Sequence, residues 1–192
     1  MCGRYVITEE MYEEYARIVR DFDPLLYALP QEIVPSRPAP VIRCEGEDLI
    51  GRNMTFGFSG YEKGKMLFNA RSETAAEKIT FKDSLLKRRC VMPAASFFEW
   101  NPEKQKAEFF LPEKQIMYLA GFYRTEEDGN HFVILTRDAN SSVRPVHERM
   151  PLILKPEDIR PWISDGALTQ QYLGLFGPEL KYQIDNEQIS LF

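Results

Sequence analysis

The sequence predicts a β-rich α+β fold. Short runs of β-forming residues recur along the 192 residues, and turn-forming residues separate them. Helical periodicity is confined to a few segments, and no internal repeat or Ser/Gly-rich linker divides the chain. Many short strands with few helices indicate a single α+β domain over residues 1–192.

The first elements follow from apolar periodicity and from proline. Residues 2–7 are expected to form a short strand that leads directly into a helix. Thr8 is the expected N-cap of this helix. Its apolar stripe comprises Met11, Tyr15, Ile18 and Val19. Three prolines within residues 31–41 predict an extended surface loop there.

The remaining elements are mostly strands. Further strands are expected at residues 49–58, 89–92, 97–100, 107–111, 116–123 and 131–136. Asp128-Gly129-Asn130 lies between the last two and signals a hairpin. A second helix is expected near Thr74, because Thr74 and Glu77 have capping-box spacing. Residues 151–154 could form another strand, and a closing helical segment is expected from Pro156 onward.

Charge and hydropathy limit the class of function. The formal net charge is −5, which does not indicate a general nucleic-acid binder, so any DNA contact requires a local basic groove. No apolar run is long enough for a transmembrane helix, and the N-terminus lacks a signal-peptide pattern. We therefore expect a cytoplasmic protein with no membrane contact.

The cysteines and histidines indicate free thiols rather than a metal site. Cys2, Cys44 and Cys90 form no CxxC pair, and their odd number argues against a disulfide scaffold. The chain has only two histidines, His131 and His147, so a structural zinc site is not expected. No metal or cofactor is therefore predicted.

The most informative segment for function is Met1-Cys2-Gly3-Arg4-Tyr5. A small second residue normally permits removal of the initiator Met, which would leave Cys2 with a free α-amine and a thiol. An amine attacks an aldehyde to form an imine, and the thiol of the same residue can then close a five-membered thiazolidine ring. Cys2 is therefore the candidate covalent nucleophile. The alternative is a buried structural cysteine.

Three other segments offer polar groups suited to such chemistry. In an extended segment, Asn69 and Arg71 would point to the same face and could hold a phosphate or an opened sugar, although a surface turn is an alternative. Glu99 is framed by aromatic residues that would raise its pKa, unless it only pairs with an arginine. His147, bounded by prolines, suits proton transfer, whereas a lone histidine is more often structural. Trp100 offers a stacking face for a base or belongs to the core.

The order of these motifs resembles that of a known family. The segments are C-G-R-Y, N-A-R-S-E-T, R-R-C, F-F-E-W, I-L-T-R-D-A-N and H-E-R-M-P, between residue 2 and about residue 154. Together they resemble the SRAP family of SOS-response-associated peptidases, or abasic-site-processing proteins. The resemblance implies a β-rich domain that binds single-stranded DNA and forms a thiazolidine crosslink with an abasic site.

The resemblance also implies roles for single residues. Cys2 would supply the amine and the thiol, and Asn69 would hold the opened sugar. Glu99 would shuttle protons, and His147 would assist ring opening and imine chemistry. The DNA-binding residues implied by the resemblance are Arg4, Arg71 and Arg149 on phosphates, with Trp100 and Phe56 stacking on bases.

Two positions depart from the family pattern. Phe56 lies in F-G-F-S-G where the family commonly has W-G-L-I-P, so the wedge that separates bases would be altered. Glu32 lies in E-I-V-P where the family often has N-V-A-P, and its carboxylate would repel a phosphate.

Two other functions stay open from the sequence. One is a cysteine peptidase that uses Cys2 with His147, including removal of its own N-terminal residue. The other is a non-catalytic module that binds single-stranded DNA. The expected partner is single-stranded DNA with abasic sites, bound by a monomer that associates with the nucleoid when DNA is damaged.

Overall fold

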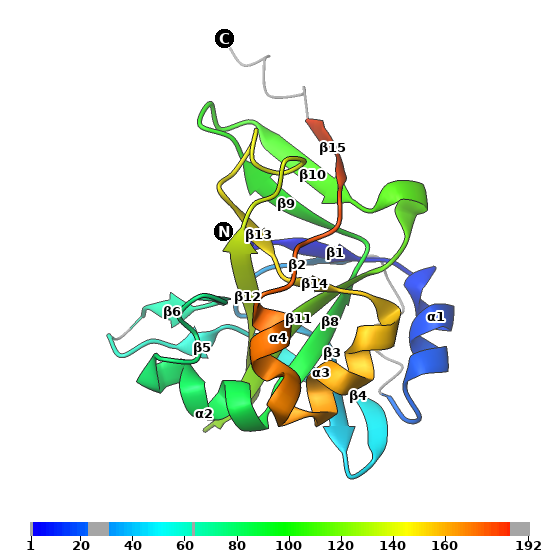
Figure 1. Ribbon diagram of the computed structural model, residues 1–192, viewed down its shortest axis with the longest axis vertical. Helices are drawn as coiled ribbons and strands as arrows, with labels where there is room; N and C mark the ends of the chain where they lie inside the picture. Colours follow the sequence, from blue (N-terminus) through cyan, green and yellow to red (C-terminus); the bar gives the residue numbers. More distant parts are fainter. Residues whose placement is uncertain (1, 23–30, 63, 185–192) are drawn as a thin grey trace.

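The architecture is built around two β-sheets. The structure is a computed structural model that describes residues 2–22, 31–62 and 64–184 (Figure 1). The larger sheet contains β3 (Pro38–Glu45), β4 (Asp48–Phe56), β7 (Asn69–Arg71), β8 (Arg89–Ala94), β11 (Met117–Glu126), β12 (Gly129–Asp138), β13 (Arg149–Pro151) and β14 (Ile153–Leu154). Its strand order is β13-β12-β4-β3-β8-β11-β14, and an additional β12–β11 pairing closes the sheet on itself. β7 pairs with β12 in parallel.

The second sheet brings the N-terminal segment against the closed sheet. It contains β1 (Tyr5–Ile7), β2 (Gln31–Ile33), β9 (Ser96–Trp100), β10 (Lys106–Phe110) and β15 (Lys181–Ile184), in the order β15-β10-β9-β1-β2. All its pairs are antiparallel. A small hairpin of β5 (Phe58–Ser59) and β6 (Met66–Leu67) completes the described strands.

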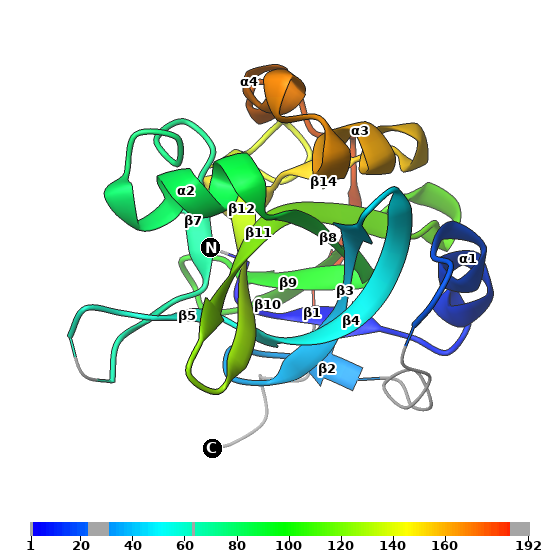
Figure 2. The same cartoon turned by 90° about the horizontal axis from the view of Figure 1, so that it is seen from below.

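In the part of the chain that the structure describes, four short α-helices pack around the closed sheet. They are α1 (Met11–Ile18), α2 (Ile79–Lys87), α3 (Ile159–Ser164) and α4 (Thr169–Leu173), with 3-10 turns at Pro112–Lys114, Pro156–Asp158 and Gly166–Leu168. Figure 2 shows α3 and α4 along one side of the closed sheet, and Figure 1 shows β9 and β10 above it. Among the described residues, no helix is both long and apolar enough to cross a membrane.

The two faces of the closed sheet contribute to two apolar clusters. On β12, Phe132 and Ile134 pack in the cluster that includes the β1 and β9 side chains. Val133 and Leu135 alternate with them and pack in the cluster that includes the helices. This alternation is the period of two expected for a strand buried on both faces. A fully buried side chain of this size contributes about 1.5–3 kcal/mol to stability.

The predicted fold class is confirmed, and most of the predicted strands are observed. The hairpin signalled by Asp128-Gly129-Asn130 joins β11 to β12. The prediction of a surface loop over residues 31–41 is wrong, because β2 and the start of β3 occupy it and Val41 is fully buried. The prolines are tolerated because the pairing of β3 with β8 begins only at Ile42, beyond Pro38 and Pro40.

Both predicted helix starts are shifted. α1 begins at Met11 with Glu10 as its N-cap, so Thr8 does not cap it. α2 begins at Ile79 with Lys78 as its N-cap. The expected capping box at Thr74 and Glu77 belongs to a turn instead, because the end of β7 extends into a turn whose backbone N–H groups at Thr74 and Ala75 donate to the Arg71 carbonyl.

Candidate functional site

The four residues predicted to carry chemistry come from four separate segments. Cys2 precedes β1, Asn69 begins β7, Glu99 lies on β9, and His147 lies in the loop between β12 and β13. β1 pairs with β9, and the Phe98 N–H donates to the Arg4 carbonyl over 2.9 Å. This pairing places the start of the chain beside Glu99.

Asn69 links the start of the chain to the closed sheet. Its Nδ2 donates to the Cys2 carbonyl over 2.9 Å. Within the described residues, its Oδ1 is buried and accepts no hydrogen bond. Leaving a buried acceptor unsatisfied costs about 1–3 kcal/mol, so this oxygen favours a ligand that brings a donor. The hydroxyls of an opened sugar are such donors.

Glu99 is a buried carboxyl close to an imidazole. Its side chain belongs to a residue that is only 3% exposed, and burial raises its pKa above the ordinary value. His147 Nε2 lies 3.8 Å from Glu99 Oε2, and its charge acts in the opposite direction on that pKa. Glu99 therefore retains a proton at higher pH than an exposed glutamate, as a general acid requires.

The backbone of Arg149 orients the His147 ring. The Arg149 N–H donates to His147 Nδ1 over 3.0 Å. The Arg149 carbonyl oxygen lies 3.1 Å from the same nitrogen, so one backbone residue offers Nδ1 both a donor and an acceptor and orients the ring in either tautomer. The other ring nitrogen, Nε2, is the one that faces the Glu99 carboxyl.

A network of carboxylates holds the Arg149 side chain. Its guanidinium donates to both oxygens of Glu73, over 2.9 and 2.8 Å, and also to Asp138 and to the Thr136 carbonyl. Burial alone would raise the pKa of Glu73, but hydrogen bonds from Arg149 bring it below its ordinary value. Glu73, in the turn after β7, was not identified from the sequence, although it lies within the N-A-R-S-E-T motif.

This network bears on the phosphate contact predicted for Arg149. The Arg149 side chain is only 11% exposed, and two carboxylates already neutralise it. A phosphate would have to replace one of them to bind the guanidinium. In this arrangement Arg149 instead ties the turn after β7 to the loop that carries His147.

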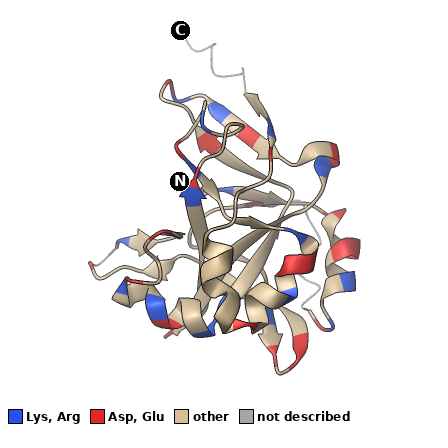
Figure 3. Ribbon diagram, in the orientation of Figure 1, with Lys and Arg blue, Asp and Glu red and all other residues tan. Residues whose placement is uncertain are grey.

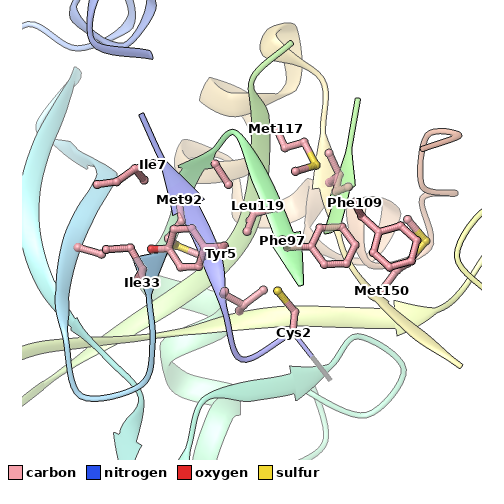
Figure 4. Close-up of a cluster of buried hydrophobic side chains, with 14 of the residues drawn as sticks. Cys2, Tyr5, Ile7, Ile33, Met92, Phe97, Phe109, Met117, Leu119 and Met150 are labelled. Atoms are coloured by element: carbon pink, nitrogen blue, oxygen red, sulfur yellow. The ribbon is translucent and has the colours of Figure 1, made fainter. Parts of the chain in front are cut away.

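Cys2 is buried rather than exposed. Its exposed fraction is 0%, and Figure 4 shows its side chain within the apolar cluster beside Phe97. Burial raises the pKa of the Cys2 thiol well above its ordinary value, and the nearby Glu99 carboxyl adds to the shift. The thiol is therefore protonated at neutral pH in this arrangement.

The predicted DNA-binding residues divide into accessible and buried groups. Arg71 is exposed at the end of β7, and Trp100 is 37% exposed on β9. Arg4 is partly exposed and lies 5.4 Å from the centre of the Trp100 ring. Phe56 has no exposed surface and stacks on Phe132 at 5.0 Å, so the structure places it in the core rather than on a DNA-binding surface.

The charged residues form no single basic face in the view of Figure 3, where basic and acidic positions are interspersed over the ribbon. Arg4, for example, forms an ion pair with Glu32 at 3.0 Å. Any attraction of DNA therefore depends on a few local cations.

These features define a class of β-rich proteins in which the second residue of the chain lies between an amide and a carboxyl–imidazole pair. The chain belongs to the SRAP family, because the family model described as SOS response associated peptidase (SRAP) matches residues 1–190.

Three curated relatives of the chain are each named as an abasic site processing protein. The chain is 28% identical over 193 residues to the abasic site processing protein YoqW of Bacillus subtilis, covering 90% of this chain and 84% of YoqW. It is 28% identical over 176 residues to the abasic site processing protein YedK of Escherichia coli, covering 85% and 79%. Over 139 residues it is 30% identical to the abasic site processing protein HMCES of Xenopus tropicalis, covering 57% and 42%.

Solved structures share the fold. A crystal structure of a protein from Bordetella bronchiseptica superposes with a TM-score of 0.80 at 20% identity, covering 96% of this chain and 100% of that one. A crystal structure of a protein from Bacteroides thetaiotaomicron also gives 0.80, at 22% identity, covering 97% and 93%. At these identities the likeness supports the architecture alone.

The raised pKa of Glu99 predicts how stability depends on pH. Because the folded protein binds this proton more tightly than the unfolded chain, the free energy of unfolding falls as pH rises above the ordinary value of 4.5, until the raised pKa is passed. The slope from this one group cannot exceed about 1.4 kcal/mol per pH unit. Glu99→Gln should remove this contribution. The stability of the variant relative to the wild type should therefore be higher near neutral pH than in acid.

Denaturant unfolding of both proteins over a pH series measures this difference. Glu103→Gln, at an exposed turn, is the matched control and should follow the wild type throughout. A difference between Glu99→Gln and the wild type that does not change with pH would show that the Glu99 pKa is not raised by folding.

Proposed function

We propose that the protein processes abasic sites in single-stranded DNA by forming a covalent thiazolidine through Cys2 after Met1 has been removed. The convergence of Cys2 with Asn69, Glu99 and His147 carries this proposal. The names of YoqW, YedK and HMCES, all abasic site processing proteins, support it. The chain would act as one domain and as a monomer in the cytoplasm, at DNA that has been damaged.

The reaction uses both nucleophiles of one residue. The Cys2 α-amine attacks C1′ of the ring-opened sugar, and the resulting carbinolamine loses one water to give an imine. Sγ then bonds to C1′ while the thiol proton moves to the nitrogen. The ring contains C1′, the nitrogen, Cα, Cβ and Sγ. Overall one water is released, and nothing is oxidised or reduced.

The surrounding groups divide the proton transfers between them. Glu99, with its raised pKa, donates a proton to the departing carbinolamine oxygen. His147 acts first on the sugar ring, because opening must precede attack on the aldehyde. Asn69 accepts a hydrogen bond from a sugar hydroxyl at its unsatisfied Oδ1.

The DNA would pass over the accessible cations and the exposed indole. Arg4 and Arg71 would meet phosphates, and the Trp100 ring would stack near the lesion. A phosphate contact by Arg149 requires exchange of the phosphate for Glu73 or Asp138. Each such contact adds about 0.7 unit to the logarithmic salt dependence of binding to a single strand.

The buried thiol favours this reaction over peptidase chemistry. A cysteine peptidase needs a thiolate, and the raised pKa of Cys2 opposes its formation. In the proposed reaction the amine attacks first, and the thiol acts only after the imine is tethered to it. A requirement for the free α-amine therefore separates the two activities, since a peptidase would need only the sulfur.

Replacing Cys2 tests the thiazolidine. Cys2→Ser keeps the α-amine, so an imine can form but the stable sulfur-containing ring cannot, and the adduct should be lost on heating. Cys44→Ser, at a half-buried cysteine, is the matched control and should crosslink like the wild type. Denaturing gels of heated reactions with an abasic oligonucleotide measure the stable fraction. A heat-stable crosslink from Cys2→Ser would rule out the thiazolidine.

Replacing His147 and Glu99 tests which step of the reaction each residue assists. His147→Ala should slow crosslinking strongly when the abasic sugar begins ring-closed, and much less on a substrate whose aldehyde is permanently open. Glu99→Gln should slow both substrates, because it cannot exchange the proton that imine formation needs. General acid–base groups of this kind contribute about 10²- to 10⁴-fold. Single-turnover rates measure both effects, and an equal defect of His147→Ala on both substrates would place His147 after ring opening.

A further inference from the structure

The outer face of the five-stranded sheet carries aromatic rings covered by cations. Because side chains alternate along β9, Glu99 points toward the site while Phe98 and Trp100 lie on the opposite face. The Lys106 ammonium lies 3.7 Å from the centre of the Phe98 ring. The Arg4 guanidinium lies 5.4 Å from the centre of the Trp100 ring. Rings paired with cations are the usual components of a surface that binds single-stranded nucleic acid.

Glu32 holds both cations in place. Its Oε1 lies 3.0 Å from Arg4 Nη1 and 3.4 Å from Lys106 Nζ. One carboxylate between two cations occupies the place that a phosphate oxygen would take. All three side chains are partly exposed, so a phosphate from solvent can compete with Glu32.

A cavity of about 290 Å³ lies beside this cluster, lined by Phe98, Lys106, Glu108, Gln183 and Ile184. It lies near the lower end of the sizes typical of small-molecule sites. The Glu108 carboxylate accepts hydrogen bonds from Ser96 and from Gln183, and it would repel a phosphate. Its oxygens can still accept from the N–H groups of a nucleobase edge, and Phe98, which is 9% exposed, adds an apolar contact to the lining.

We propose that this outer face binds one unpaired nucleotide that flanks the abasic site. Its base enters the cavity and packs against Phe98 and Lys106, and its phosphates replace Glu32 between Arg4 and Lys106. Lys106 is then a DNA-binding residue, and Glu32 is an internal competitor that weakens binding. This inference rests on the proposed function, because it extends the path of the same strand.

Two substitutions of opposite expected sign test the proposal. Lys106→Met keeps most of the apolar stem but removes the charge, so binding should weaken and the logarithmic salt slope should become shallower by about 0.7 for single-stranded DNA. Glu32→Gln keeps the size but releases both cations, so binding should strengthen severalfold. Lys104→Met, at an exposed turn on the same hairpin, is the matched control and should change neither quantity.

The affinities are measured by fluorescence anisotropy for a long abasic oligonucleotide and for a minimal one that carries the abasic sugar with its phosphates but has no nucleoside on either side of the lesion. The ratio of the long to the minimal affinity should fall in Lys106→Met, rise in Glu32→Gln and stay constant in Lys104→Met. Equal behaviour of the two lysine variants, or unchanged or weaker binding by Glu32→Gln, would overturn the proposal.

Crosslinking by the wild type separates failure of the outer-face site from failure of the proposed function. If the wild type crosslinks the minimal oligonucleotide but the affinity ratios do not move, the outer-face site is wrong and the proposed function stands. If the wild type crosslinks neither oligonucleotide, the proposed function fails and the outer-face inference fails with it.

Discussion

The position of Cys2 depends on strand β1, which is paired on both sides, with β2 and with β9. A strand inside a sheet cannot slide without losing both ladders, so its register fixes the residues that precede it. The hydrogen bond from Asn69 to the Cys2 carbonyl adds a second restraint from the closed sheet. An N-terminal segment would otherwise be among the least ordered parts of a domain.

Burial around Cys2 has two opposite consequences for chemistry. It raises the pKa of Glu99, which makes that carboxyl a proton donor nearer to neutral pH. It also raises the pKa of the Cys2 thiol, which suppresses the thiolate. A reaction that begins with the amine and uses the sulfur later is compatible with both effects, because the tethered thiol reacts intramolecularly. The protonated carboxyl of Glu99 and the protonated thiol of Cys2 are therefore both consistent with a reaction in which the amine attacks first.

Alternating apolar residues predicted most strands, because that pattern reflects the buried faces directly. β15 was not predicted, because it has only four residues, is mostly exposed, and is set by its pairing with β10. The motifs identified the four chemical residues, whose convergence needs the pairing of distant strands. They did not show that Phe56 is buried or that carboxylates neutralise Arg149, because burial and ion pairing depend on neighbours from other parts of the chain.

The central claim is that a free α-amine and a thiol on Cys2 react together with the aldehyde of an abasic site. Intact-protein mass spectrometry after incubation with abasic single-stranded DNA tests it most directly. The comparison is between the chain from which Met1 has been removed and a chain whose N-terminus is blocked by a retained residue. The account predicts an adduct equal to protein plus DNA minus one water for the first chain only. The same adduct formed at the same rate by the blocked chain would contradict it.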